Sequence, residues 1–403
     1  MKSNVSILMV VLALCVILSK VHGTLSPSSK SKKGSKTTSK EKEFKVKVGP
    51  QQLSVFDRNL IEDEPSARDI LVESGSYYKD TENRLFNGTV LGYVTSWNNH
   101  GYDVAKIWGT KFDIISPVWL QIVRLPSGEY QINGEHDVDS GWIKDVRTAG
   151  HHKNKIIPRV LFDKFTDKDF SRLLTYEEQK AAVASLILKT CQKHGFNGIV
   201  LEIWSQLAVR VEDKHLIDFV TQIAKTLRSH SMETVLVIPP FRKEMYDLFS
   251  KQHFDALYPV ISWFSLMTYD FSSIQRPGAN APLHWMRNAV EHICPDSSTN
   301  LSAKRSKILL GLNLYGNDFT PDGGSAIIGH EYLSFLKYVK GRLSHDETNA
   351  ENFFEVKTPT GRHIVFYPTL YSVYERIQLA RELGTGISLW ELGQGLDYFY
   401  DLF

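Results

Sequence analysis

Apolar and polar positions follow two different periods along most of the chain. From residue 91 onward, short runs of mainly apolar residues are followed by stretches in which apolar residues recur every three to four positions. The first pattern is typical of buried strands and the second of amphipathic helices. Eight strand and helix repeats predict an α/β fold, a (β/α)8 TIM barrel. The expected strands are residues 91–97, 114–120, 156–162, 196–204, 234–240, 261–270, 308–316 and 386–393.

Residues 352–368 lie between the seventh and eighth expected strands. They contain two short alternating runs around Pro359, Thr360 and Gly361. Alternation on both sides of a Pro/Gly turn is typical of a β-hairpin, although a plain connection between a strand and a helix has a similar pattern. A short hairpin insertion between strands 7 and 8 is therefore expected.

A helix is predicted directly before the fourth expected strand. Thr175 and Glu178 have the spacing of a capping box, and the apolar periodicity that follows continues to His194. Gly195 can end this helix in the left-handed conformation. Residues 196–204 therefore follow a helix and are expected to be a strand.

Side chains alternate along a strand, so this segment has two different faces. Val200, Glu202 and Trp204 share one face, whereas the other face is wholly apolar and suited to packing on helices. We therefore expect Glu202 and Trp204 to point into the barrel mouth.

The spacing of Asn197, Val200, Glu202 and Trp204 resembles the D-x-x-D-x-D-x-E signature of glycoside hydrolase family 18, the chitinases. In that family the final Glu protonates the glycosidic oxygen, and the preceding Asp orients the N-acetyl group that serves as the nucleophile. Trp204 stands at the position of this acid, and an indole N–H cannot give up its proton near neutral pH. The resemblance therefore implies a degenerate motif without a catalytic residue, in which the general-acid contribution of about 10²- to 10⁴-fold is missing.

Three further segments are similar to the same family, in the same order along the chain. Residues 267–270, Met-Thr-Tyr-Asp, are similar to the sugar-contact motif of strand six, Tyr315 to the aromatic residue that ends strand seven, and Trp390 to the Trp that floors the central sugar subsite. Aromatic faces stack on the C–H faces of sugar rings, while interleaved carboxylates bind the hydroxyl groups. The resemblance implies these ligand contacts: Glu202, Trp204, Met267, Tyr269, Asp270, Tyr315 and Trp390.

Each of these contacts has a structural alternative. Glu202 is either a sugar contact or a buried carboxylate that neighbouring polar groups satisfy. Asp270 ends strand six at the face where barrel sites form, which favours a functional role. For Trp97 and Trp119 core packing is the favoured interpretation, whereas the family register favours ligand contact for Trp204 and Trp390.

A subgroup of the family shares the Glu-x-Trp departure. The resemblance implies a secreted or lysosomal lectin-like protein that binds chitin-type oligosaccharides and lipopolysaccharide without cleaving them and serves innate immunity. It also implies a receptor partner of the stabilin-like scavenger type. Two alternatives stay open: an active glycosidase that uses Glu202 or Asp270 as its acid, and a protein-interaction scaffold with a vestigial cleft.

The N-terminal part predicts export. Residues 1–23 have a basic start, an apolar stretch too short to span a bilayer and a small-residue ending, as in a signal peptide. Residues 24–48 are expected to be a basic disordered arm, since eight Lys and two Glu lie within residues 24–47. The rest of the chain is net acidic, which argues against nucleic acid as a partner. Residues 49–83 are expected to be an extension, and residues 84–403 the barrel.

The remaining patterns concern modification, thiols and cofactors. Asn87 and Asn300 begin N-x-Ser/Thr glycosylation acceptors. Cys191 and Cys294 remain after signal cleavage, either as one disulfide or as two buried thiols. The sequence contains no metal-binding or phosphate-loop pattern, and the Gly-rich residues 321–325 are expected to form a turn. No cofactor, metal or membrane span is expected.

Overall fold

The structure is a computed structural model that describes residues 45–243 and 246–403. The expected signal peptide lies outside these residues, as does nearly all of the expected basic arm. Lys45–Phe403 form a single compact unit.

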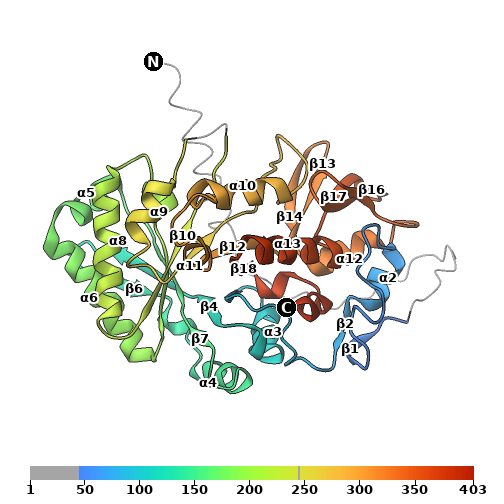
Figure 1. The fold of residues 1–403 in the computed structure, drawn as a ribbon, viewed down its shortest axis with the longest axis horizontal. Coiled ribbons are helices and arrows are strands. Elements are labelled where there is room, and N and C mark those ends of the chain that lie inside the picture. Colours follow the sequence, from blue (N-terminus) through green and yellow to red (C-terminus); the bar gives the residue numbers. More distant parts are fainter. Residues whose placement is uncertain (1–44, 244–245) are drawn as a thin grey trace, which may run out of the picture. The chain divides into compact units, whose positions relative to one another are not determined.

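A curled, mainly parallel sheet positions all other elements of this unit (Figure 1). Its strands are β3 (Val90–Thr95), β4 (Ile114–Val118), β5 (Leu120–Arg124), β6 (Tyr130–Asn133), β7 (Lys155–Ile156), β8 (Arg159–Phe162), β9 (Gly198–Glu202), β10 (Glu233–Ile238), β11 (Trp263–Leu266), β12 (Ile308–Asn313) and β18 (Gly386–Trp390). They are ordered β6-β5-β8-β9-β10-β11-β12-β18-β3-β4-β7, and the β5–β6 pair is antiparallel. Each of the eight expected strands contains residues of this sheet.

Two of the expected strands are interrupted, and the interruptions explain how the sheet curls. Trp119 separates β4 from β5, while Ile157 and Pro158 separate β7 from β8. Proline has no N–H group to donate to a strand ladder, which accounts for the second break. Because β4 pairs with β7 and β5 pairs with β8, strands two and three are neighbours along both of their parts. This arrangement is consistent with the expected TIM barrel.

Helices cover the outer side of the sheet, and α5, α6 and α8 lie together on one side of it in Figure 1. The α-helices that follow β3, apart from the one in the insertion described below, are α3 (His100–Ile107), α4 (Ser140–Ala149), α5 (Asp167–Thr175), α6 (Glu177–His194), α7 (Trp204–Leu207), α8 (Asp213–Arg228), α9 (Lys251–Leu257), α10 (Leu283–Ile293), α11 (Leu301–Arg305) and α13 (Leu370–Leu383). Gly195 ends α6 with a φ of 65°, as predicted. The predicted capping box is wrong, because Thr175 is the last residue of α5 and Tyr176 is the N-cap of α6.

The alternation along each strand separates two apolar clusters. Ile199 and Leu201 belong to the large cluster between the sheet and its helices. Val200 belongs to a smaller cluster inside the curl of the sheet, with Met267 and Trp390 packed against it. The predicted apolar outer face of the fourth strand is therefore confirmed.

The segment between β12 and β18 forms a second, antiparallel sheet, which with one helix is called the insertion below. Its elements are β13 (Gly316–Thr320), β14 (Gly323–Ile327), α12 (Gly329–Leu336), β15 (Ser344–Asp346), β16 (Glu351–Thr358) and β17 (Gly361–Phe366), with the strand order β14-β13-β17-β16-β15. Residues 321 and 322 make the turn between β13 and β14. The insertion is thus larger than the short hairpin that the sequence suggested, because β13 and β14 are Gly-containing strands that lack a clear apolar alternation.

Residues before the sheet form β1 (Val48–Gln51), α2 (Ala67–Glu73) and β2 (Gly75–Tyr78), with β1 and β2 in parallel, and the Tyr78 N–H donates to Asp401 near the C-terminus. Glu73 accepts hydrogen bonds from Lys47 and Arg58. Cys191 and Cys294 are both buried and unpaired thiols. None of the described helices combines the length and the apolar character needed to cross a membrane.

Candidate saccharide-binding site

Six of the seven predicted contacts meet at the carboxyl ends of the parallel strands. Glu202 is the last residue of β9 and Trp390 is the last residue of β18. Met267 directly follows β11 and packs with Trp390 on the inner apolar cluster. In parallel barrels this edge carries the functional site. The residues brought together are Glu202, Met267, Tyr269, Asp270, Tyr315 and Trp390.

A buried arginine, which the sequence did not point to, holds Glu202. Arg159 lies on β8 and its guanidinium Nε donates a hydrogen bond to Glu202 Oε2. The Arg159 side chain is 3% exposed, against 25% for Glu202. Burial alone would lower the pKa of Arg159, but the charge of Glu202 and this hydrogen bond raise it above its ordinary value. The guanidinium carbon also lies 5.8 Å from the ring centre of Trp390, so Arg159 contacts both the Glu202 carboxylate and the Trp390 indole.

Side chains inside the curled sheet support the Trp390 indole. Trp390 packs against Tyr93 on β3 with 5.1 Å between the ring centres. The Tyr93 hydroxyl donates to Ser265 Oγ at 2.9 Å, and Ser265 Oγ lies 3.2 Å from Ser388 Oγ. Burial raises the pKa of Tyr93, so this hydroxyl stays neutral and serves as a fixed donor. The indole of Trp390 therefore rests on a rigid, internally satisfied layer.

Asp270 and Tyr315 form a second polar group at this edge. The Tyr315 hydroxyl donates to Asp270 Oδ1, and Tyr269 meets the Tyr315 ring edge to face at 6.4 Å. Asp270 has a φ of 59°, a left-handed conformation that Asp tolerates better than most residues. The residue is exposed to solvent, yet surrounding protein atoms raise the pKa of its carboxyl against the opposing effects of Tyr315 and the Arg242 charge. Of the two predicted acidic residues, Asp270 is exposed and Glu202 is half-buried.

Glu391, the residue after Trp390, is a buried acid that was not among the predicted site residues. Its side chain accepts hydrogen bonds from Asn98 Nδ2 at 2.6 Å and from the Gly393 N–H at 3.1 Å. Burial raises the pKa of Glu391 to about 7, although these hydrogen bonds and the charge of His100 lower it. Asn98 follows the loop residue Trp97, so Glu391 connects the loop after β3 to the strand that carries Trp390.

Trp204 differs from the prediction. Its side chain is 1% exposed, its indole N–H donates to the Leu248 carbonyl at 2.7 Å, and its ring packs edge to face on Phe249 at 4.9 Å. The strand ends at Glu202, and α7 begins at Trp204, so the alternation that would turn this side chain inward does not continue. The expectation that Trp204 points into the barrel mouth and contacts a ligand is therefore corrected.

The other two positions of the degenerate motif are structural. Asn197 lies before β9, at the amino end of the sheet, where its Oδ1 accepts the Ile156 N–H at 2.9 Å. Val200 is buried in the inner apolar cluster. Neither side chain reaches the group around Trp390.

The two remaining tryptophans predicted for the core behave differently. Trp119 is fully buried, as predicted, and its indole N–H donates to the Tyr102 hydroxyl at 2.7 Å. Trp97, also predicted for the core, is 54% exposed on the loop after β3. The prediction for Trp97 is wrong because the strand ends at Thr95, two residues earlier than expected.

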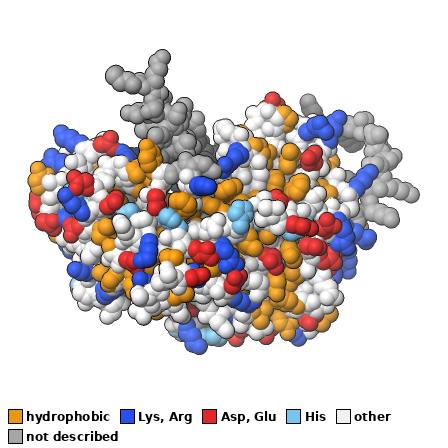
Figure 2. Space-filling model, turned by 45° about the horizontal axis from the view of Figure 1, so that its top comes forward, with side chains coloured by type: hydrophobic (Ala, Val, Ile, Leu, Met, Phe, Trp, Pro, Cys, Tyr) orange, Lys and Arg blue, Asp and Glu red, His pale blue; other side chains and the backbone are white. Residues whose placement is uncertain are grey.

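The surface carries both glycosylation candidates and charged side chains of both signs. Asn87 and Asn300, the glycosylation candidates, are both exposed. Acidic and basic side chains are interspersed over the face drawn in Figure 2. Within residues 45–243 and 246–403, no three His, Cys, Asp or Glu side chains are grouped in a way that could hold a metal ion.

Comparison with known proteins agrees with this geometry. The model of the family "Glycosyl hydrolases family 18" matches residues 89–395, which include every strand from β3 to β18. The chain belongs to this family. It is 24% identical over 250 residues to the cortical fragment-lytic enzyme of Bacillus subtilis (strain 168), a match that covers 59% of this chain and 56% of that enzyme. The chain therefore matches little more than half the length of this curated relative.

Solved structures share the fold. A chitinase from Chromobacterium violaceum is 18% identical, with a TM-score of 0.64 over 78% of this chain and 98% of that one. The spore cortex-lytic enzyme SleL of Bacillus cereus is 17% identical, with a TM-score of 0.64 over 78% of this chain and 73% of that one. A family 18 chitinase mutant from Cycas revoluta, solved in complex with (GlcNAc)4, is 16% identical, with a TM-score of 0.63 over 78% of this chain and 97% of that one.

Proposed function

We propose that this chain is a saccharide-binding member of family 18 that does not cleave its ligand. One observation carries the proposal. At the position of the family's acid, Trp204 is buried and its indole N–H donates to a backbone carbonyl. The neighbouring Glu202 is tied to the buried Arg159. Glu202 therefore serves as the counter-charge of a buried guanidinium. The position of the family's acid therefore offers an indole and no carboxyl in this chain.

The proposed ligand is an oligomer of N-acetylglucosamine. Trp390 offers an aromatic surface, while Asp270 and Glu202 offer carboxylates at the same edge of the curled sheet, which we take to be a complete (β/α)8 barrel. Apolar ring faces and hydroxyl groups of a sugar need this combination. The Cycas revoluta chitinase complex with (GlcNAc)4 supports this choice of ligand.

The finer parts of the proposal follow the Glu-x-Trp resemblance. We infer that the chain is similar to chitinase domain-containing protein 1, and thus a secreted or lysosomal lectin with an innate-immune role. Lipopolysaccharide is the second proposed ligand, since its lipid A part carries a glucosamine disaccharide. A scavenger receptor of the stabilin type is the proposed protein partner.

Replacing Trp390 with alanine is expected to weaken the binding of N-acetylglucosamine oligomers by about 1–3 kcal/mol, because the stacking surface is lost. Calorimetric titration of the folded variant measures this change. Tyr176→Ala is the matched control, since Tyr176 is a 49% exposed aromatic residue at the start of α6, on the helical exterior. Equal affinity of Trp390→Ala and the wild type would contradict the assigned site.

The alternative function is an active glycosidase, and the Asp270 carboxyl favours it. Its raised pKa is the property that a general acid needs near neutral pH. Under our proposal, prolonged incubation with N-acetylglucosamine oligomers gives no cleavage products. Products that disappear in Asp270→Asn, or in Glu202→Gln, would establish the enzyme and identify its acid.

A further inference from the structure

A chain of hydrogen bonds connects the loop that carries Asp270 to the insertion. The Asp270 N–H donates to Asn280 Oδ1 at 2.9 Å, and the Phe271 N–H donates to the Asn280 carbonyl at 2.8 Å. Asn280 is 2% exposed. Its Nδ2 donates to Asn317 Oδ1 on β13 at 3.1 Å. One buried amide therefore joins the Asp270 backbone to the antiparallel sheet of the insertion.

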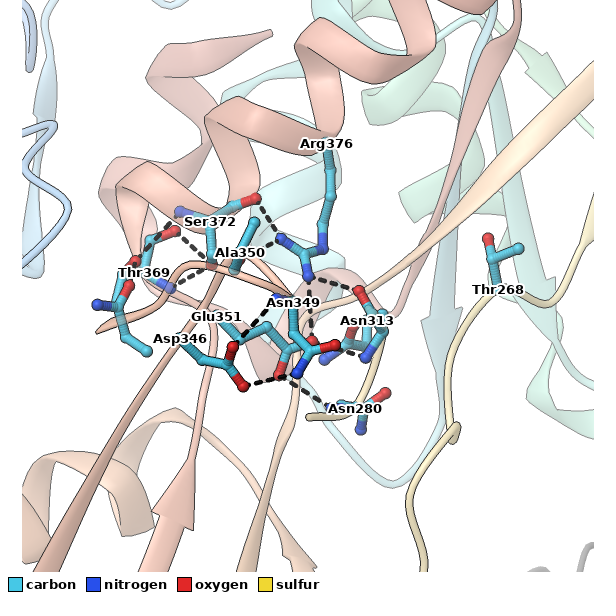
Figure 3. A network of polar contacts seen from close by, with 12 residues as sticks. Thr268, Asn280, Asn313, Asp346, Asn349, Ala350, Glu351, Thr369, Ser372 and Arg376 are labelled. Atoms are coloured by element: carbon cyan, nitrogen blue, oxygen red, sulfur yellow. Dashed lines mark hydrogen bonds and ion pairs between the residues drawn. The ribbon is translucent and has the colours of Figure 1, made fainter. Parts of the chain in front are cut away.

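The backbone of Asn280 is fixed in turn by a buried ion pair, shown in Figure 3. Glu351 on β16 accepts the Asn280 N–H at 2.9 Å and the Ala281 N–H at 2.6 Å. Arg376 on α13 donates to Glu351 Oε1 at 3.0 Å and to the Ala281 carbonyl at 2.5 Å. Its other terminal nitrogen donates to the Ala350 carbonyl at 2.8 Å. Both charges are thus surrounded by polar partners.

This network has a definite effect on the site. Asp270 has a left-handed backbone conformation, and a non-glycine residue keeps such a conformation only where its surroundings fix it. Asn280 satisfies the Asp270 N–H in that conformation, and the hydrogen bond from the Tyr315 hydroxyl then fixes the carboxylate. Without the Asn280 side chain, the Asp270 N–H would lose its partner in the described network, whereas the Phe271 N–H would keep the backbone carbonyl of residue 280.

We propose that Asn280, anchored by the Glu351–Arg376 pair, is the positioning residue that sets the Asp270 carboxylate toward the saccharide. The inference rests on the proposed function, because it assigns Asp270 a role in ligand binding. It makes the insertion a determinant of the binding site through a contact that does not itself touch the ligand.

The test is Asn280→Ala, which removes the amide side chain and leaves the backbone N–H on Glu351 in place. Asn154→Ala is the matched control: Asn154 is also buried, and its Nδ2 donates to the Val146 carbonyl at 3.1 Å, but it lies before β7, at the amino end of the sheet and away from the network around Asp270. Calorimetry is expected to show about tenfold weaker oligosaccharide binding for Asn280→Ala. The control is expected to bind like the wild type even where its stability falls.

A second readout does not depend on the ligand. The titration of the Asp270 carboxyl carbon is followed by NMR and assigned by its loss in Asp270→Asn. In Asn280→Ala the midpoint is expected to fall toward the ordinary value of an Asp, because the carboxyl leaves the surroundings that raise its pKa. A midpoint equal to that of the wild type would overturn the positioning role. A different outcome would overturn the proposed function and keep the positioning role: the wild type binds no saccharide, but the Asp270 midpoint in Asn280→Ala is still lower than in the wild type.

Discussion

Arg376→Met is expected to lower the free energy of unfolding by about 3–5 kcal/mol, because it leaves the buried carboxylate of Glu351 without its counter-charge. The two side chains are 5% and 10% exposed. Burial already raises the pKa of Glu351, and Arg376 is the main opposing influence. The substitution also removes the donors of the Ala281 and Ala350 carbonyls. Urea unfolding with an unchanged m-value measures the loss.

Arg342→Met is the matched control for this prediction. Arg342 also pairs with a glutamate, Glu62, at 2.5 Å, but the two side chains are 56% and 40% exposed. Exposed pairs typically contribute less than about 1 kcal/mol. Equal destabilisation by the two substitutions would mean that the Glu351–Arg376 pair does not hold the loop around Asn280 to the insertion.

The second large effect is a loss of stability as the pH rises, caused by Glu391. Its carboxyl has a pKa of about 7 in the folded chain and the ordinary value of 4.5 when unfolded. Between these values the folded state binds the extra proton, so its contribution to stability is complete below about pH 4.5 and is lost as the pH rises through about 7. The total change is about 3 kcal/mol. Glu391→Gln imitates the protonated carboxyl and is expected to remove this part of the pH dependence.

The comparison of the two pH profiles isolates Glu391 from the other groups with shifted pKa values. Asp401, whose pKa burial raises to about 6, and Lys111, whose pKa burial lowers to about 8, are present in both proteins. His100 is present in both proteins as well; its pKa is raised mainly by its contact with Asp397, while the charge of Glu391 is the last of the causes that raise it. Parallel profiles for the wild type and Glu391→Gln between pH 4.5 and 8 would show that Glu391 does not hold a proton in the folded state.

The pattern of apolar positions predicted the strands well, because a strand inside a curled sheet must be apolar or strictly alternating. It placed Glu202 and Trp390 in the fourth and eighth strands, and the structure has them as the last residues of β9 and β18. It misplaced Trp204, since alternation was continued beyond the point where the strand becomes a helix. The strand ends at Glu202, two residues earlier than expected, and strand ends are the least predictable feature of a sequence.

The residues that position the site residues could not be predicted from the sequence. Arg159 and Glu391 act through partners that are distant in the chain, Glu202 and Asn98, whereas Asn280 acts through Asp270, ten residues earlier. No local period or motif relates such residues, because their proximity arises only when the strands pair. The one available signal was a charged residue inside an otherwise apolar strand, as Arg159 is in the third expected strand.

The most direct test of the central claim is calorimetric titration of the purified chain with N-acetylglucosamine oligomers, followed by analysis of the same mixtures for cleavage products. We expect saturable binding and intact oligomers after prolonged incubation. Shortened oligomers formed by the wild type, and absent after Glu202→Gln or Asp270→Asn, would contradict the account, and so would the lack of any binding.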